Sequence, residues 1–573
     1  MTLLHDVQPA GLVLSPALGL VLAVIAASLY ALYLWALPKP LPGIPYNVES
    51  TKKLLGDAPD LKRAILETNE FNTWCAQQNE KHKSAIVQVF IDPLSKPWIL
   101  LSDFGEAQDI LLRRKDFDRS TFISDRMGPL GCFQARFKTN NYWKMSREWV
   151  KDLMTPSFLE TFVGPGINEA VLNLLKLWEE KARLGNGRPF AAGDDLNHCS
   201  LDVMLCFSFG KHLGHSALGP QLDLLSQLQP SQIKAGPLDE PVHFPEAPTH
   251  EFIKATHDST VLTEILVNAW SPRLYLWWMR QWTWYKQVFG ATDRNIREQV
   301  QASVERMRAG AMGTTAVDHM CMREESHAAK LKRSPLYDSQ HMTDEIFGIV
   351  FAGHHTTGAA LAWIAKFMGE CPDAQKKLRS ALEAAYPTAV EEKRLPSWDE
   401  MKHAKVHYLD AFVEEALRLH STSVTRETER DAVVLGHHIP KGTTFILNSN
   451  GAGFYSPRFP VDDSKRSSTS TKVGAWDESK DMKAFEPERW LVKRPNGDIE
   501  FDGAAGPQLI FGLGPRGCFG KRLAYIEMRV FTTLLCWNFH MAEVPKPLSS
   551  HAAADGISHK ALYCYVRPQK RVL

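Results

Sequence analysis

Apolar residues recur at three- and four-residue spacing along much of the chain, which is the pattern of amphipathic helices. The pattern is strongest in five segments: residues 142–155, 195–210, 344–369, 405–420 and 520–537. Runs typical of strands are short and few, at residues 85–91, 98–101, 443–447 and 561–566. The sequence therefore predicts a mainly α protein with small β-sheets.

The N-terminal region carries a long apolar run without a charged residue, from Leu12 to Leu37. Such a run is long enough to span a bilayer. A signal peptide is the alternative, but it would need a basic start and a shorter apolar stretch, whereas only His5 and Asp6 precede this run. Lysines follow it at positions 39, 52 and 53, so the positive-inside rule predicts that the remaining chain faces the cytoplasm.

These patterns predict four parts of the chain. They are a short lumenal tail at 1–11, a single-pass membrane anchor at 12–37, a Pro-rich linker at 38–49 and one catalytic domain at 50–573. The linker contains PKPLPGIP, and because proline disfavours helix at and before its own position, we expect a stiff extended spacer. Polar stretches at 220–249 and 462–480 are predicted as surface loops.

Charge and cysteine content exclude two classes of protein. The chain has 66 Lys and Arg against 65 Asp and Glu, a net charge of +1. This balance argues against a nucleic-acid-binding protein. The nine cysteines are scattered and include no C-x-x-C, which favours reduced thiols over a disulfide framework.

Residues 511–520 read FGLGPRGCFG, and their glycines fit G-x-G-x-x-G. A dinucleotide-binding turn would also need a preceding strand and an acidic residue about twenty positions later. No Asp or Glu lies between Met528 and Ala542, and Pro515 falls inside the turn. A buried structural cysteine is a second alternative.

Cys518 has the surroundings of a metal-binding thiolate. A helical pattern begins just after Gly520, and the unpaired N–H groups at a helix N-terminus favour a thiolate over a thiol. Gly517 and Gly520 would allow a flat group to approach the backbone, and Arg516 could pair with a carboxylate on that group. Together these features describe the proximal side of a haem.

FGLGPRGCFG resembles the haem-binding segment of cytochrome P450, F-x-x-G-x-R-x-C-x-G, with Phe511, Gly514, Arg516, Cys518 and Gly520 in its fixed positions. The resemblance implies the cytochrome P450 fold, with haem b between a distal kinked helix and a proximal Cys loop. It implies that Cys518 is the axial iron ligand, that Arg516 contacts a propionate and that Phe511 packs against the sulfur.

Other segments resemble further motifs of the family, in the same order. Glu415 and Arg418 form an E-x-x-R, and Arg489 lies in FEPERW, which resembles F-x-P-E-R-[FW]. The resemblance implies that these three residues form a structural network; alone, E-x-x-R would more often be a solvated pair. Three further residues, Trp143 and Arg147 of a W-x-x-x-R and Arg426, are implied to contact the haem propionates.

AGHHTT at 352–357 resembles the distal-helix motif [AG]-G-x-[DE]-T-[TS], with Thr343 as the expected N-cap of this helix. Thr356 takes the position of the alcohol residue. A helical threonine normally bonds back to the carbonyl four residues earlier, here that of Ala352. If the Thr356 hydroxyl breaks this pattern, the helix opens into a groove for dioxygen and water.

His355 stands where the family usually has Asp or Glu. We hypothesise that His355 replaces the acid in proton delivery, since imidazole titrates near neutrality and can exchange protons at both nitrogens. A histidine satisfied by neighbouring polar groups is an equally good interpretation. A metal site shared by His354 and His355 is disfavoured, because side chains at adjacent positions of a helix point about 100° apart.

The resemblance implies an enzyme, a membrane-anchored haem-thiolate monooxygenase. It would insert one atom of O2 into a small apolar or amphipathic organic substrate, with electrons from a separate NADPH-cytochrome reductase. The implied location is the endoplasmic reticulum membrane, single-pass, with the catalytic domain facing the cytoplasm. The function would suit secondary-metabolite biosynthesis, and oxidation of foreign compounds for their clearance is the alternative role. An isomerase or dehydratase of the same fold and a membrane-tethered haem sensor are the alternatives.

Two groups of residues are expected to contact partners. Basic residues at 144, 521, 522 and 529 are either a docking face for the reductase or ordinary solvated charges. Substrate contacts are expected from 122–133, 207–228, Phe347, Phe351, Ala352, 421–424 and 556–557.

Overall fold

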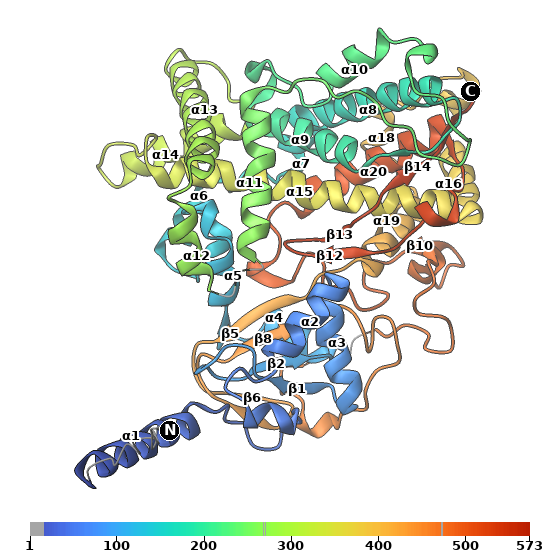
Figure 1. Ribbon diagram of the computed structural model, residues 1–573. Helices are drawn as coiled ribbons and strands as arrows, with labels where there is room; N and C mark the ends of the chain where they lie inside the picture. Colours follow the sequence, from blue (N-terminus) through green and yellow to red (C-terminus); the bar gives the residue numbers. More distant parts are fainter. Residues whose placement is uncertain (1–15, 268, 270, 471–473, 573) are drawn as a thin grey trace, which may run out of the picture.

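The computed structural model describes residues 16–267, 269, 271–470 and 474–572. A large helical lobe sits against a smaller lobe built around a β-sheet, and helix α1 projects from the smaller lobe (Figure 1). The principal helices are α1 (Pro16–Ala36), α2 (Ala58–Thr68), α3 (Phe71–His82), α4 (Phe104–Leu112), α5 (Thr121–Arg126), α6 (Asn141–Trp149), α8 (Gly164–Gly185), α9 (Gly193–Phe209), α10 (Gly219–Ser226), α11 (Glu251–Val267), α12 (Pro272–Met279), α13 (Thr283–Arg308), α14 (Ala316–Lys330), α15 (Gln340–Glu370), α16 (Pro372–Ala385), α19 (His407–Leu419) and α20 (Lys521–Asn538).

The largest sheet has five strands in the order β1-β2-β8-β5-β3. Their bounds are β1 (Ile86–Val89), β2 (Trp98–Leu101), β3 (Phe117–Asp118), β5 (Val424–Thr428) and β8 (Thr444–Leu447). β2 and β8 run parallel with Ile99 opposite Phe445, and the other pairs are antiparallel. Segments from both halves of the sequence therefore build this sheet together.

Five two-stranded sheets complete the β-structure of the described residues. They pair β6 (Ala432–Val434) with β7 (His437–Ile439), β9 (Leu491–Lys493) with β10 (Ile499–Phe501), β11 (Phe539–Met541) with β15 (Pro568–Lys570), β12 (Ala553–Asp555) with β13 (His559–Ala561), and β4 (Phe190–Ala191) with β14 (Tyr565–Val566).

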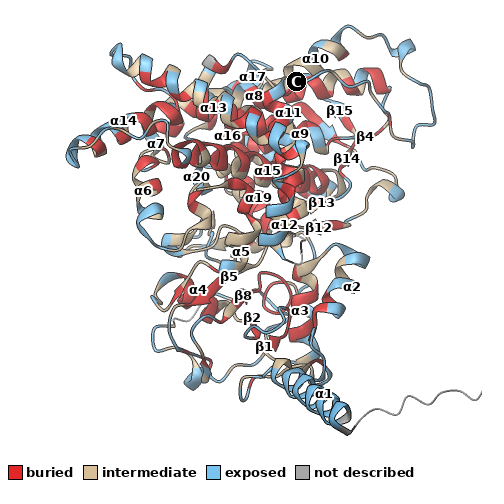
Figure 2. Ribbon diagram, turned by 60° about the vertical axis from the view of Figure 1, so that its left-hand side comes forward, coloured by how far each residue is buried: buried red, intermediate tan, exposed pale blue. Residues whose placement is uncertain are grey.

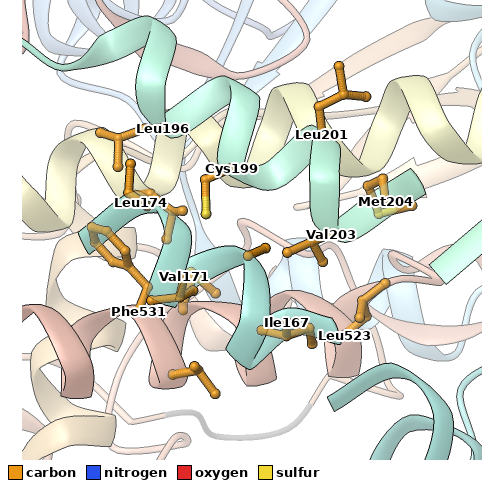
Figure 3. Close-up of a cluster of buried hydrophobic side chains, with 14 of the residues drawn as sticks. Ile167, Val171, Leu174, Leu196, Cys199, Leu201, Val203, Met204, Leu523 and Phe531 are labelled. Atoms are coloured by element: carbon orange, nitrogen blue, oxygen red, sulfur yellow. The ribbon is translucent and has the colours of Figure 1, made fainter. Parts of the chain in front are cut away.

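The helical core is centred on α15, which is buried along most of its length (Figure 2). Helices α8, α9 and α20 contribute apolar side chains to a shared cluster that includes Val171, Cys199 and Phe531 (Figure 3). α15 approaches α9 closely because Gly353 has no side chain: a Cβ at this position would overlap the side chain of Met204. This packing fixes the stretch of α15 that carries the distal motif.

The prediction of a mainly α protein with small sheets is confirmed. All five predicted helices form, although α6 ends at Trp149 rather than continuing to 155. The prediction of one continuous strand over 561–566 is wrong, because β13 ends at Ala561 and a separate strand, β14, begins at Tyr565. All nine cysteines are free, as expected.

The predicted N-cap of α15 is wrong. The cap is Ser339, whose hydroxyl accepts a hydrogen bond from the N–H of Met342, and Thr343 lies inside the helix. Because α15 begins at Gln340, Asp344 and Glu345 lie beyond its first turn. Their carboxylates instead accept hydrogen bonds from the backbone N–H groups of Cys132 and Gln134, and so tie this loop to α15.

The apolar N-terminal run forms α1, which begins at Pro16, so that residues 12–15 of the predicted anchor and the predicted tail lie outside the described residues. Searching the described part of the chain reveals no helix with both the length and the apolarity needed to cross a membrane. The predicted span is therefore not confirmed.

The Pro-rich segment does not act as a free spacer over its whole length. Gln88 of β1 accepts a hydrogen bond from the N–H of Leu41 at 2.7 Å and donates to the carbonyl of Ile44 at 2.8 Å. The side chain of Ile44 is buried in the smaller lobe. Packing against the sheet thus begins at Leu41, ahead of the boundary expected at residue 50.

Candidate active site

A cavity of about 840 Å³ lies between α15 and the loop that contains Cys518. Its wall also includes residues of α2, α5, α6, α9, β5 and α20 and of the turn between β12 and β13. Among the residues expected at the haem, the lining includes Phe511, Arg516, Cys518, Gly520, Trp143, Arg147, Arg426 and Thr356. Residues from distant parts of the sequence therefore meet at one site.

Cys518 lies at the wall of this cavity, and its exposed surface faces the cavity. Its backbone N–H donates to the carbonyl of Phe511 at 2.7 Å, which closes the loop. Helix α20 begins at Lys521 with Gly520 as its N-cap, as the sequence predicts. Burial raises the pKa of the Cys518 thiol, while the backbone N–H groups of Gly520 and Lys521 and the charge of Lys521 act in the opposite direction.

The glycines of this loop have distinct roles. Gly514 has φ of +68°, and a Cβ there would overlap the carbonyl oxygen of Leu111 at the end of α4. By contrast, a Cβ at Gly520 would meet no atom within 4 Å. The space beside Gly520 is part of the cavity. This clearance suits a flat group lying over the loop.

Five arginines, from the segment after β3, α5, α6, β5 and the Cys518 loop, line the cavity: Arg119, Arg126, Arg147, Arg426 and Arg516. The guanidinium of Arg516 lies over the ring of Trp143, 4.7 Å from its centroid, and donates to the carbonyl of Phe137. Burial, with the nearby charge of Arg119, lowers the pKa of Arg516 to about 10. Burial and the charges of Arg119 and Arg516 lower that of Arg426 to about 9.

Several nitrogen atoms of these cations are buried without a hydrogen-bond acceptor among the described residues, namely Nε of Arg119 and Nε and Nη1 of Arg516. Unpaired buried guanidinium groups are costly, and three of them close together repel one another. A bound group with carboxylates would satisfy them. The residues present therefore fit a planar dicarboxylate such as haem.

Arg119 was missed by the sequence analysis. It follows β3 directly, outside any helical or motif spacing, and reaches the cavity only because β3 pairs with β5, the strand that carries Arg426. No local sequence signal distinguishes it from the other arginines.

Glu415 and Arg418 of α19 form a buried ion network with Arg489, which lies in the segment just before β9. Glu415 accepts two hydrogen bonds from Arg418, both at 2.8 Å, and one from Arg489 at 3.0 Å. Trp490 donates to the same carboxylate at 2.9 Å. Arg418 also donates to the carbonyl of Phe454, so the network joins α19 to two loops.

On the distal side, α15 runs unbroken through residues 352–357. The hydroxyl of Thr356 donates to the carbonyl of Ala352 at 2.7 Å, so it keeps the ordinary helical pattern and does not itself open a groove. Thr356, Ala352 and Gly353 all line the cavity. Phe511, on the opposite wall, packs against the ring of Tyr525 at 5.1 Å between centroids.

His355 is not among the residues that line the cavity. Its Nε2 atom lies 3.1 Å from Oε1 of Glu264 on α11, while its Nδ1 atom is buried with no hydrogen-bond partner among the described residues. The neighbouring His354 bonds through Nδ1 to the carbonyl of Val350. The two histidines therefore serve different partners, and the described residues include no cluster that could hold a metal ion through histidine, cysteine or carboxylate groups.

Comparisons with known proteins agree with this geometry. The family model for cytochrome P450 matches residues 66–454 and 480–558. The chain belongs to the cytochrome P450 family. Family membership carries with it a haem-thiolate cofactor, an organic substrate, O2 and a redox partner.

Several curated P450 relatives are fungal monooxygenases. The chain is 42% identical to cytochrome P450 monooxygenase xilC of Penicillium rubens, over 94% of both chains. It is 34% identical to cytochrome P450 monooxygenase TRI13 of Fusarium sporotrichioides, over 95% of this chain and 98% of the relative. The crystal structure of a cytochrome P450, CYP102L1, superposes with a TM-score of 0.66 at 15% identity, covering 93% of this chain and 100% of that one, which supports the fold.

The P450 cavity is lined by most, but not all, of the segments expected to contact substrate. Apolar side chains from five described segments face it, including Phe122, Ile123, Phe133, Phe207, Ala352, Val424 and Ile557. Phe347 and Phe351 do not line it, because both are buried in the core, where Phe347 contacts Phe289 of α13 and Phe351 contacts the ring of Phe347. Residues of α2 and the end of α11, which the sequence analysis did not include, complete the wall.

The basic residues expected near Cys518 differ in their surroundings. Lys144, Lys521 and Arg522 are exposed. Arg529 is half-buried and paired with Asp410, so it is a structural cation rather than part of an open docking face.

Proposed function

We propose that this P450 is a haem-thiolate monooxygenase of secondary metabolism. It inserts one atom of O2 into a small apolar or amphipathic organic molecule. The observation that carries the proposal is the placement of Cys518 and Thr356 on the wall of one cavity, beside two arginines with buried nitrogen atoms that find no acceptor among the described residues. The similarity to fungal P450 monooxygenases supports the biosynthetic role.

In this proposal Cys518 ligates the iron of haem b. Arg119, Arg426 and Arg516 hold the propionates, and Trp143 and Arg147 close the same end of the cavity. When bound, a haem with a thiolate ligand supplies O2 activation and oxygen insertion. The backbone N–H groups of Gly520 and Lys521 stabilise the negative charge on the sulfur.

The other residues position the substrate and exclude water. Phe122, Phe133, Phe207 and Ile557 give the cavity an apolar wall, which binds an apolar substrate and keeps bulk water out. Thr356 places a hydroxyl at the distal wall; since its proton is donated to the carbonyl of Ala352, its oxygen is the atom that can accept a hydrogen bond from a bound molecule. The Glu415 network holds the loops beneath α19 in place without taking part in the chemistry.

We propose that electrons come from a separate NADPH-cytochrome reductase. The exposed cations Lys144, Lys521 and Arg522 lie on α6 and at the start of α20, close to the Cys518 loop. An acidic face on the reductase would be complementary to them.

Attachment to the endoplasmic reticulum membrane is part of the same proposal, with the catalytic domain on the cytoplasmic side. Apolar side chains of α1 are exposed, among them Leu20 at 68% and Trp35 at 62%. A second exposed apolar group lies on α12, which carries Leu274, Trp277 and Trp278 and also the exposed Arg273. Tryptophan next to basic residues suits the interface between lipid and water. Resistance to carbonate extraction, lost on deletion of residues 1–37, would test this attachment.

The oxygenation is tested by reconstituting the full chain with reductase and NADPH under ¹⁸O2. An apolar metabolite extract serves as the substrate pool. We expect products that each carry one ¹⁸O atom and that require both NADPH and reductase. Products without the label, or labelled products formed without reductase, would contradict the proposed function.

A further inference from the structure

Helix α11 crosses α15 beside the distal motif (Figure 1), and a histidine–carboxylate pair connects the two helices there. The pair joins Glu264 of α11 to His355 of α15. The two residues differ in exposure: the side chain of Glu264 is 37% exposed and that of His355 is 5% exposed. The pair therefore extends from the protein surface to a buried position beside Thr356.

Residues beside both ends of the pair line the cavity, although neither Glu264 nor His355 is itself part of the wall. Thr356, next to His355, lines the cavity, and so does Val267, one turn after Glu264 on α11. His355 contacts Glu264 through its Nε2 atom. Its other ring nitrogen, Nδ1, is buried without a partner among the described residues. An imidazole with one nitrogen on an accessible carboxylate and the other unsatisfied can accept a proton on one side and release it on the other.

We propose that Glu264 and His355 form a proton relay in which Glu264 supplies, from a neighbouring helix, the carboxylate that the distal motif of this chain lacks. This inference rests on the proposed monooxygenase function. Glu264 is the outer, positioning residue, and His355 passes protons toward the Thr356 side of the cavity.

The transfer balances as one proton per cycle. With the neutral ring in its Nδ1–H tautomer, a proton from solvent adds to the Glu264 carboxylate and moves to Nε2 of His355. The proton on Nδ1 passes to an acceptor in the cavity, where the reduction of O2 by the proposed monooxygenase consumes it. Glu264 is then a carboxylate again and the ring is neutral. Conversion of the ring from the Nε2–H tautomer back to the Nδ1–H tautomer restores the starting state.

The electrostatic surroundings favour an ionised Glu264. Burial acts to raise the pKa of Glu264, but the hydrogen bond and charge of His355, together with Lys560 and His257, lower it overall. The other groups facing this region are His354 on α15 and His198 on α9. Burial lowers the pKa of His354 to about 3, so His354 is neutral at physiological pH and does not compete as the relay.

The test compares Glu264→Gln, His355→Asn and the double variant in the haem-loaded full chain. Asp431→Asn is the control, since it alters a His–carboxylate pair, His438 with Asp431, on the exposed β6–β7 side. During NADPH oxidation with reductase, we expect both single variants to divert roughly tenfold more electrons to hydrogen peroxide and to show a larger solvent deuterium isotope effect. The double variant should be no worse than His355→Asn, because residues that act in series are not additive. Glu264→Asp should restore part of the coupling.

A second readout does not depend on turnover. The infrared C–O stretch of the reduced, CO-bound protein reports charges and hydrogen-bond donors near the distal side. We expect Glu264→Gln and His355→Asn to shift this band in the same direction and Asp431→Asn to leave it in place.

Unchanged peroxide yield and an unchanged C–O band in Glu264→Gln would overturn the relay, as would additive losses in the double variant. If the wild-type chain binds no thiolate-ligated haem, the proposed function fails first. If it does and Glu264→Gln behaves as wild type, only the relay fails.

Discussion

The guanidinium of Arg516 lies over the indole ring of Trp143, 4.7 Å from its centroid, although the two residues are separated by most of the chain. The contact links α6 to the Cys518 loop at one end of the cavity. There two nitrogen atoms of Arg516 find no acceptor in the part of the chain that the structure describes, and its neighbours Arg119 and Arg426 are also cations. This end of the cavity is therefore built for negative charge.

Arg119→Ala should weaken haem retention. Loss of one charge-assisted hydrogen bond costs about 1.5–3 kcal/mol, which corresponds to roughly 10- to 100-fold faster haem loss. The haem-free protein should behave in the opposite way: its melting temperature should rise, because a buried cation beside Arg426 and Arg516 is removed. Haem transfer to excess apomyoglobin and thermal melts of both forms measure the two effects.

Arg126→Ala is the matched control, since Arg126 lines the same cavity but donates to the carbonyls of Val267 and Phe122. It should not speed haem loss. Equal acceleration by both variants would contradict a specific role for Arg119.

Glu415→Gln should destabilise the whole catalytic domain. Glu415 is fully buried and binds Arg418, Arg489 and Trp490, so its neutralisation leaves the buried Arg418 without its carboxylate and Arg489 with Glu486 alone. Breaking a buried pair costs about 3–5 kcal/mol. Denaturant unfolding should show this loss, whereas Glu392→Gln, in an exposed pair with Arg394, should change stability by less than about 0.5 kcal/mol. Similar effects of the two substitutions would argue against a structural network.

Glu527→Gln should flatten the dependence of stability on pH. Burial raises the pKa of Glu527 from 4.5 to about 8, with Ser200 as its hydrogen-bond donor. Between these values the folded state keeps a proton that the unfolded state releases, so this group makes stability fall as pH rises. Glutamine cannot ionise, so the melting temperature of the variant should exceed that of wild type by a margin that grows from pH 4.5 to pH 8. Parallel curves over this range would show that Glu527 does not titrate as described.

The helical architecture and the motif residues near Cys518 were predictable because both depend on short-range patterns. Periodic apolar residues predict α9, α15, α19 and α20, and FGLGPRGCFG places Cys518 at the start of a helix. A helix boundary is harder to predict. Thr343 and Ser339 are both good N-caps, and the choice of Ser339 leaves Asp344 and Glu345 free to bind the loop at 132–134.

Contacts between distant segments left no signal in the sequence. Arg119 reaches the cavity through the pairing of β3 with β5, and Glu264 meets His355 because α11 crosses α15. The Pro-rich segment likewise packs on β1 because Gln88 satisfies the backbone of Leu41 and Ile44. Each depends on tertiary packing rather than on local propensity.

The most direct test of the central claim is the carbon monoxide difference spectrum of the reduced full-length protein, with wild type beside Cys518→Ser. The account predicts a strongly red-shifted Soret band in the wild type, produced by a thiolate-ligated haem, and its loss in Cys518→Ser. A wild-type protein that binds no haem, or a red-shifted band that persists in Cys518→Ser, would contradict Cys518 as the iron ligand.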